Sequence, residues 1–181
     1  ELYAVDSRVA DGTQSYMAYG RNTYALYNSR GLDLEDRAAY TLCMGLDLVH
    51  DGEEMFDGSE DRDGRLGDFD LKEVAKKAVE DAVSAIGADS VPSGKYHVVF
   101  TGRAFAQLLA TYSSVFSAEA VQKGMSLLQG KEGEKIDADM VTLIDDPMHP
   151  ESLVKRTFDG EGVAAFEKNV IEEGVLKTLL H

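Results

Sequence analysis

The run Tyr96-His97-Val98-Val99-Phe100, which lies between Ser93-Gly94 and Thr101-Gly102, decides the fold that the sequence predicts. The run is short, apolar and rich in β-branched and aromatic residues, which is typical of a strand covered on both faces. From Arg103 the spacing changes to that of a helix with one apolar side, formed by Phe105, Leu108, Leu109, Tyr112, Val115 and Phe116. We therefore predict a central strand over 96–100 and a helix over 103–116, followed by a return strand over 140–144.

The other side of the predicted helix offers no obvious catalyst. Its remaining residues include Ala110, Thr111, Ser113 and Ser114. None of these side chains binds a metal well or acts as a general base at neutral pH. The two serines have no basic residue beside them in the sequence, and a serine nucleophile needs a base close by in space. The helix therefore occupies a place suited to catalysis without carrying the groups for it.

The first third of the chain predicts an antiparallel meander. Residues 15–19 and 23–28 alternate like strands, and Gly20-Arg21-Asn22 is expected to join them. Residues 28–31 form a second predicted turn, with Gly31 suited to a left-handed backbone. Residues 39–48 then alternate over ten positions, with Tyr, Leu and Met on one face. Residues 53–70 are acidic and rich in glycine, and we expect them to form an exposed connection.

A helix over residues 70–86 is the clearest helical prediction. Asp70 can cap its first turn, with Glu73 at the position of a capping box. Its apolar stripe consists of Leu71, Val74, Ala75, Ala78, Val79, Ala82, Val83 and Ile86. Gly87 and Pro92 prevent the helix from continuing. We expect the stripe to cover the apolar side of the meander, and residues 163–171 and 175–180 to form a terminal hairpin.

Composition limits the possible functions. The chain has 181 residues, 28% of them charged, and a formal net charge of −15. This charge disfavours direct binding to nucleic acid or to an anionic membrane. The single cysteine, Cys43, excludes an internal disulfide, and the four histidines lie far apart in no ligand spacing. The sequence thus predicts an α+β protein of antiparallel β meander and hairpins packed with a few amphipathic helices, and we expect it to be a piece of a longer protein.

Six short sequence segments in the second half of the chain, taken in their order, resemble segments of the TldD/PmbA family, whose members are also called modulators of DNA gyrase. They are residues 92–100, 122–128, 133–135, 142–147, 158–163 and 171–176. Upstream, residues 28–32 and the capped helix fit the same family. The resemblance implies two parts, with residues 1–90 at the end of an N-terminal αβ domain and residues 91–181 at the start of a C-terminal β-rich domain. It also implies a cytoplasmic, bacterial or archaeal protein that associates as a dimer.

In the metallopeptidase branch of this family, the helix after the central strand carries H-E-x-x-x-H, in which two histidines hold zinc and the glutamate serves the attacking water. The corresponding residues here are Ala110 to Val115, so the positions of both histidines and the glutamate are occupied by Ala110, Val115 and Thr111. The chain therefore resembles the PmbA or TldE branch, which binds no metal. The resemblance implies no cofactor and no catalytic residue in this chain, and leaves open whether the chain itself is an enzyme.

Two acidic clusters are candidates for substrate binding. Asp145 and Asp146 follow the return strand, and paired carboxylates can perform acid–base chemistry; the plainer interpretation is a turn in which a carboxylate binds backbone N–H groups. Asp159, Glu161 and Gly162 lie in a second glycine-rich turn, where glycine would allow a peptide backbone to approach closely.

The first functional hypothesis is a PmbA/TldE-type subunit that helps form the dimer and the peptide-processing cavity. Its partner would be a second copy or a zinc-bearing TldD-type subunit, and its substrate a peptide that could add to a sheet edge. One alternative is a regulatory binding protein that modulates gyrase or a toxin–antitoxin system without a peptidase role. Another is a metal-independent hydrolase that uses the four carboxylates of the two clusters.

Overall fold

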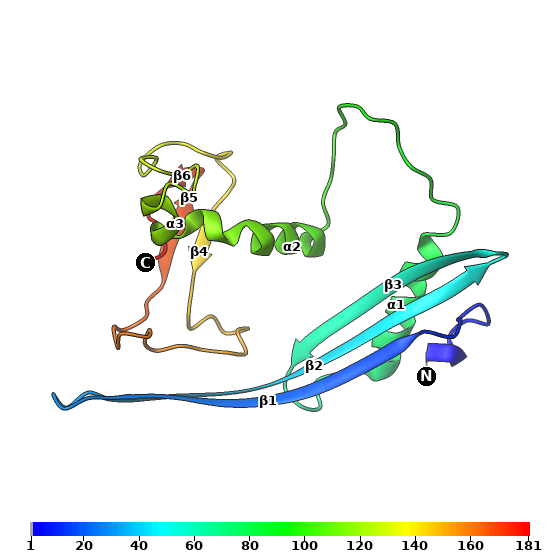
Figure 1. The fold of residues 1–181 in the computed structure, drawn as a ribbon, viewed down its shortest axis with the longest axis horizontal. Coiled ribbons are helices and arrows are strands. Elements are labelled where there is room, and N and C mark those ends of the chain that lie inside the picture. The colour runs from blue at the N-terminus through cyan, green and yellow to red at the C-terminus, as the bar shows by residue number, and fades with distance from the viewer. Residues whose placement is uncertain (1) are drawn as a thin grey trace. The chain divides into compact units, whose positions relative to one another are not determined.

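The computed structural model describes residues 2–181, and their contacts divide the chain into two compact units. Unit 1 consists of residues 1–92 and 150–164, and unit 2 of residues 93–149 and 165–181. Antiparallel sheets with a few helices make up both units, as the ribbon in Figure 1 shows, so the predicted α+β class is confirmed.

Unit 1 is built on a three-stranded antiparallel sheet in the order β1-β2-β3. Its strands are β1 (Gln14–Tyr27), β2 (Asp33–Asp51) and β3 (Glu54–Gly64), and a short 3₁₀ turn, η1 (Leu2–Ala4), precedes them. The turn predicted at Gly20-Arg21-Asn22 is wrong, because β1 continues through these residues in register with β2. The turn predicted after residue 28 is confirmed: the Asn28 side chain accepts hydrogen bonds from two backbone N–H groups, and Gly31 has a φ of 91°.

Strand β3 replaces most of the connection that we expected between residues 53 and 70. Its aspartates and glycines are poor strand formers by themselves, which is why the sequence predicted a loop. All eleven residues of β3 nevertheless pair with β2, from Glu54 opposite Asp51 to Gly64 opposite Thr41. Pairing with a strong neighbouring strand therefore overrides the local propensity.

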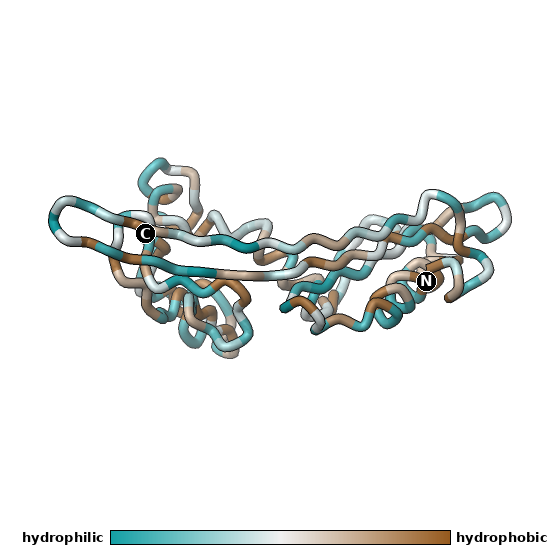
Figure 2. Tube along the Cα trace, turned by 90° about the horizontal axis from the view of Figure 1, so that it is seen from below, coloured by the Kyte–Doolittle hydropathy of each residue, from teal (hydrophilic) through white to brown (hydrophobic). Residues whose placement is uncertain are grey.

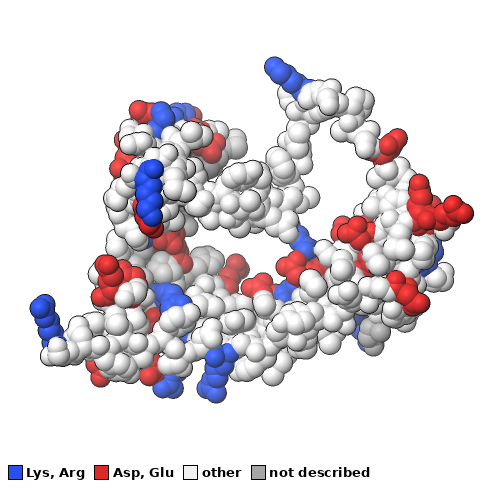
Figure 3. Space-filling model, in the orientation of Figure 1, with Lys and Arg blue, Asp and Glu red and all other residues white. Residues whose placement is uncertain are grey.

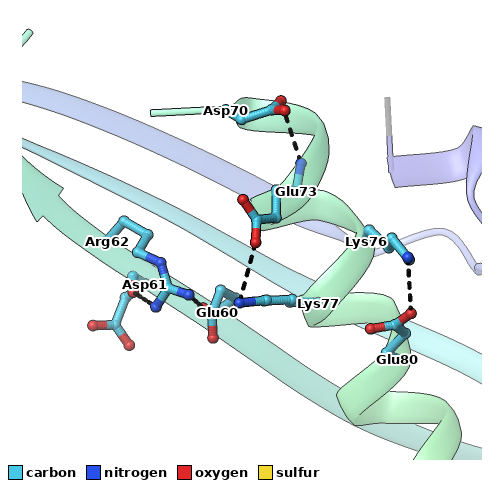
Figure 4. Close-up of polar contacts among 8 residues, drawn as sticks. All are labelled: Glu60, Asp61, Arg62, Asp70, Glu73, Lys76, Lys77 and Glu80. Atoms are coloured by element: carbon cyan, nitrogen blue, oxygen red, sulfur yellow. Dashed lines mark hydrogen bonds and ion pairs between the residues drawn. The ribbon is translucent and has the colours of Figure 1, made fainter. Parts of the chain in front are cut away.

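Helix α1 (Leu71–Ser84) confirms the predicted capped helix. The Asp70 carboxylate accepts hydrogen bonds from the backbone N–H groups of Lys72 and Glu73, and Lys77 forms an ion pair with Glu73 at 3.3 Å (Figure 4). Hydrophobic and hydrophilic residues are interspersed along the helix in Figure 2, as expected for a helix with one apolar face. The buried residues are Val74, Ala75, Ala78, Val79 and Ala82.

The helix covers the opposite face of the sheet from the one we expected. The buried residues of β2 are Thr41, Cys43, Gly45, Asp47 and Val49. Leu42 lies on the other face, which carries most of the large apolar residues, and it is exposed. Small residues on this face explain why the helix covers it. A Cβ atom on Gly58 of β3 would lie 2.1 Å from the backbone nitrogen of Ala82. The alanine-rich helix therefore packs closely because sheet and helix both present small groups.

Beyond the end of β3, strands β1 and β2 continue as a two-stranded arm, residues 20–40, whose register has no irregularity. Residues 150–164, the docking loop, belong to unit 1 although the chain around them belongs to unit 2. Arg156, Thr157 and Gly162 of this loop all contact the arm. A segment distant in sequence therefore completes unit 1.

Unit 2 has its own hydrophobic core. Its elements are α2 (Gly102–Tyr112), η2 (Ser113–Phe116), α3 (Ala118–Gln122), β4 (Leu143–Asp145), β5 (Lys168–Glu172) and β6 (Val175–Leu176). The buried residues of the core are Phe116, Ala118, Val121, Val170, Ile171, Leu176 and Leu179. Strands β5 and β6 form a terminal hairpin that is shorter than the one predicted over residues 163–171 and 175–180. Glu173 and Gly174 at its turn both have positive φ, as a tight two-residue hairpin turn requires.

The predicted central strand over residues 96–100 is wrong. This segment lies outside every strand of the described residues, and Val99 is 96% exposed. An apolar run becomes a strand only where a neighbouring strand bonds to its backbone, and the side-chain pattern carries no information about that neighbour. The predicted helix over 103–116 is partly confirmed, since α2 ends at Tyr112 and a 3₁₀ turn follows.

Candidate functional site

The segment where the family resemblance places a zinc motif spans two helical elements. Ala110 and Thr111 lie in the last turn of α2, and Val115 lies in the 3₁₀ turn η2. None of these three residues has a side chain that binds a metal strongly. Thr111 and Ser113 do carry hydroxyl groups, but each hydroxyl donates a hydrogen bond of 2.8 Å to a backbone carbonyl of α2, from Gln107 and Ala110 respectively.

The chemistry of this segment therefore does not fit a zinc ion. Zinc is held by thiolate, imidazole or carboxylate groups, and hydroxyls that already bind their own helix cannot replace them. Across residues 2–181, no three histidine, cysteine, aspartate or glutamate side chains gather closely enough to hold a metal ion. No step of a metal-dependent reaction can be derived from these residues.

Asp145 and Asp146 lie at the end of β4 in unit 2, and both carboxylates have partners. Asp145 lies opposite Lys168 of β5 and forms an ion pair with it at 2.8 Å. Asp146 accepts a hydrogen bond of 2.9 Å from the backbone N–H of Met148, so it stabilises the turn that leaves the strand. These contacts support the turn interpretation for Asp146, whereas Asp145 closes the β4–β5 pair.

Asp159, Glu161 and Gly162 lie together in the docking loop of unit 1. The Asp159 carboxylate accepts hydrogen bonds of 2.9 Å from the backbone N–H groups of Glu161 and Val163. These bonds lower the pKa of Asp159 below its ordinary value. Gly162 has a φ of 86°, and a Cβ atom there would lie 2.8 Å from a methyl group of Leu32 in the arm. The turn is thus built by Asp159 and needs glycine for its contact with the arm.

Polar contacts between the docking loop and the arm involve residues that the sequence analysis missed. Thr157 donates two hydrogen bonds to the Asp36 carboxylate, from its backbone nitrogen at 2.8 Å and from its hydroxyl at 2.6 Å. These bonds lower the pKa of Asp36 below its ordinary value. The guanidinium of Arg156 lies 3.3 Å above the ring centre of Tyr24, which is directly opposite Asp36 in the arm. No local pattern could reveal this contact, because 121 residues separate its two sides.

Asp47 is a second residue that the sequence analysis missed. It is fully buried beneath α1, and neither carboxylate oxygen has a hydrogen-bond partner among the described residues. Burial raises the pKa of Asp47 from 3.8 to about 6, and the nearby Thr13 hydroxyl offsets only part of this effect. The alternation of β2 does place Asp47 on one face with Cys43 and Gly45, but the sequence did not show that a helix covers this face.

One open cavity lies beside α1 in unit 1. Its volume is about 490 Å³, and its lining includes Leu2, Tyr16, Met17, Cys43 and Leu71. The lining is mostly apolar and has no carboxylate or imidazole group that could catalyse a reaction.

The fold defines a class, an α+β protein segment of antiparallel sheets and a few helices. Residues 1–86 match the profile of the PmbA/TldA metallopeptidase central domain, and residues 93–181 match that of the PmbA/TldA metallopeptidase C-terminal domain. The chain belongs to the TldD/PmbA family. The predicted boundary at residue 90 and the domain roles on either side of it remain predictions.

Solved structures of relatives have the same fold. A proposed modulator of a DNA gyrase from Thermotoga maritima is 35% identical, with a TM-score of 0.92 over 99% of this chain and 42% of its own length. TldE from Thermococcus kodakarensis is 25% identical, with a TM-score of 0.78 over 99% of this chain and 41% of its own.

Curated relatives are also longer than this chain. An uncharacterised protein from Methanocaldococcus jannaschii is 32% identical over 96% of this chain, and a metalloprotease from Methanothermobacter thermautotrophicus is 35% identical over 62% of it. The chain spans 39% and 25% of these two relatives. Within residues 2–181, none of the helices combines the length and apolar character that crossing a bilayer requires.

Proposed function

We propose that this chain is part of a PmbA/TldE-type subunit, which helps form a peptide-processing cavity without binding zinc itself. The observation that carries the proposal is the degenerate zinc position: Ala110, Thr111 and Val115 offer no ligand, and the neighbouring hydroxyls are bonded to their own helix. The similarity to TldE from Thermococcus kodakarensis supports the same assignment. The family resemblance adds the expectation of a cytoplasmic location.

In this proposal the subunit associates either with a second copy or with a zinc-bearing TldD-type partner, and peptides are the substrate. The contribution of the present chain is structural, because Asp145, Asp146 and Asp159 all hold local structure through ion pairs or backbone hydrogen bonds. Glu161 and Asp159 are exposed in the docking-loop turn, whereas Asp145 and Asp146 are half-buried, so the docking-loop pair has the greater access to a peptide.

The experiment is zinc analysis and peptide cleavage with the full-length protein, alone and with a TldD-type subunit. We expect no stoichiometric zinc in the protein alone, and cleavage only when the partner is present. The matched control is a variant of the partner in which the glutamate of H-E-x-x-x-H is replaced by glutamine, which removes cleavage if the partner supplies the catalyst. Cleavage by the metal-stripped protein alone would contradict the proposal and favour the metal-independent hydrolase.

A regulatory role without peptide processing is the second candidate, and one specific observation favours it. Solved relatives from Thermotoga maritima and Bacteroides thetaiotaomicron are both described as proposed modulators of DNA gyrase. The formal net charge of −15 argues that such a role would proceed through a protein partner rather than through DNA. Binding to purified gyrase, together with no cleavage under any of the conditions above, would favour this candidate.

A further inference from the structure

The contact between helix α1 and the sheet of unit 1 combines close packing with unsatisfied polar groups. Gly58 lies opposite Asp47 in the sheet, and a Cβ atom on Gly58 would lie 2.1 Å from the backbone nitrogen of Ala82 in α1. Sheet and helix therefore meet at backbone level beside Asp47, which leaves little space for water. Among residues 2–181, neither carboxylate oxygen of Asp47 has a hydrogen-bond partner, and the buried hydroxyl of Thr41 on the same face of β2 has none. Buried polar atoms without partners are costly, so they weaken the packing on this face.

The apolar contact that holds α1 is small. Its buried residues are three alanines and two valines, and the stabilisation from apolar burial grows with the buried area. The segments on either side of the helix, residues 65–69 and 85–101, lie outside every helix and strand of the described chain. The helix can therefore leave the sheet as a unit without breaking the pairing of β1, β2 and β3.

The groups that surround Asp47 do not neutralise its charge. The lysines in the middle of α1 form ion pairs along the helix, Lys76 with Glu80 and Lys77 with Glu73 (Figure 4). Asp81 of the same helix accepts a hydrogen bond from a backbone N–H of β3, and the buried Glu60 of β3 pairs with Arg62. The Thr13 hydroxyl lowers the pKa of Asp47 by less than burial raises it. Figure 3 shows further acidic side chains over the part of unit 1 that contains α1, so the surroundings oppose the ionisation of Asp47.

We propose that Asp47 makes the docking of α1 depend on pH: the helix stays on the sheet while the carboxyl group is neutral, and undocks as a unit more often once the group is ionised. Ionisation favours the undocked state because water reaches the carboxylate only there. Burial raises the pKa of Asp47 to about 6, so the ionised form predominates at neutral pH. Helix α1 is therefore a cover that is held more tightly in mildly acidic solution than at neutral pH.

Undocking of α1 exposes Cys43, the one cysteine of this chain. Cys43 lies on the same face of β2 as Asp47, and 7% of its surface is exposed. It lines the cavity beside α1 together with Leu71, Val74 and Ala75 from the first turns of the helix. Since these helix residues limit access to the cysteine, the rate at which a reagent modifies its thiol reports on the undocked state.

The test measures how fast Cys43 of the full-length protein reacts with a pyridyl disulfide between pH 4.5 and 7.5. Each rate is divided by the rate of the urea-unfolded protein at the same pH, which cancels the change in thiolate, and mass spectrometry of peptides assigns the label to Cys43. We expect the ratio to rise by roughly tenfold to a hundredfold and to level off above pH 6, because the pKa of Asp47 falls from about 6 to 3.8 when the helix undocks.

Two matched substitutions separate the buried charge from other effects of pH. Asp47→Asn should remove the rise, because no charge forms beneath the helix. Asp57→Asn removes an exposed carboxylate from the same sheet and should leave the rise unchanged.

A thiol in the core of unit 2 separates undocking of α1 from unfolding of the whole protein. Val170→Cys in a Cys43→Ala background places this thiol at a position that is 1% exposed, and its labelling ratio should not change with pH. Hydrogen exchange of peptides from β5 and β6 gives the same comparison without a substitution in unit 2.

A labelling ratio of Cys43 that stays constant with pH would overturn the inference, as would an Asp47→Asn variant that keeps the rise. An equal rise for the thiol at position 170, or for hydrogen exchange in β5 and β6, would also overturn it, because the whole protein and not α1 alone would then open.

Discussion

The buried Asp47 allows a quantitative prediction about the pH dependence of stability. Its carboxylate is fully buried beneath α1, and burial raises its pKa from 3.8 to about 6. Between these two pH values the folded protein binds more protons than the unfolded chain. The free energy of unfolding therefore decreases as the pH rises from 3.8 to about 6, and the full loss persists above that pH.

The size of the loss follows from the same difference in pKa. One pKa unit corresponds to about 1.36 kcal/mol, so the ionised Asp47 lowers the free energy of unfolding by about 3 kcal/mol above pH 6. Asp47→Asn keeps the shape and removes the ionisation. Its amide N–H groups still lack partners, which retains part of the desolvation cost. We therefore expect the variant to be more stable than the wild type by about 1–3 kcal/mol at pH 7.5, and to differ little at pH 4.5.

Hydrogen exchange measured by mass spectrometry is the suitable assay, because it reports on unit 1 separately. Protection of peptides that cover β2 and α1 is measured at pH 4.5 and 7.5 and corrected for the intrinsic exchange rates. Asp57→Asn is the control, since it removes one negative charge from an exposed position in the same sheet. If Asp47→Asn lowers protection at pH 7.5, or raises it equally at both pH values, the reasoning about the buried charge is refuted.

Four further predictions concern packing, capping and docking. Gly58→Ala should destabilise unit 1 by about 3 kcal/mol or more, because the new Cβ would overlap backbone atoms of α1, whereas Gly102→Ala at an open position should be nearly neutral in thermal unfolding. Asp70→Ala should cost about 1 kcal/mol in urea unfolding through loss of the helix cap. Asp36→Ala should make residues 150–164 sensitive to limited proteolysis, because the two hydrogen bonds from the docking loop are lost. Leu176→Ala should destabilise unit 2 by about 2–5 kcal/mol in urea unfolding, because the side chain is fully buried.

Features that depend on neighbouring residues could be predicted from the sequence. The helix beginning after Asp70 needs only its cap and its stripe, and the terminal hairpin needs only two positive-φ residues between strands. Both signals lie within a few positions of the structure that they produce. The lack of metal ligands at Ala110, Thr111 and Val115 was likewise visible, because it is a property of the residues themselves.

Features that depend on distant partners could not be predicted. Strand β3 exists because β2 pairs with it, although its own residues favour a loop. The segment over residues 96–100 has the pattern of a strand and lies outside every strand of the described residues, because the pattern does not supply a neighbour. The sequence also predicted the wrong face of β2 as the one under the helix. The helix packs on the face with small residues, because small residues allow a close approach.

The docking loop has a consequence for any attempt to divide this protein. The chain passes between the two units after residues 92, 149 and 164, so neither unit is one continuous piece of sequence. A fragment that starts at residue 93 would carry Arg156 and Thr157 without Tyr24 and Asp36, and a fragment that stops at residue 92 would leave the arm without its loop. Cutting the chain between residues 92 and 93 thus separates residues that contact each other within unit 1. A single proteolytic cut within residues 150–164 leaves the link at residues 92–93 intact.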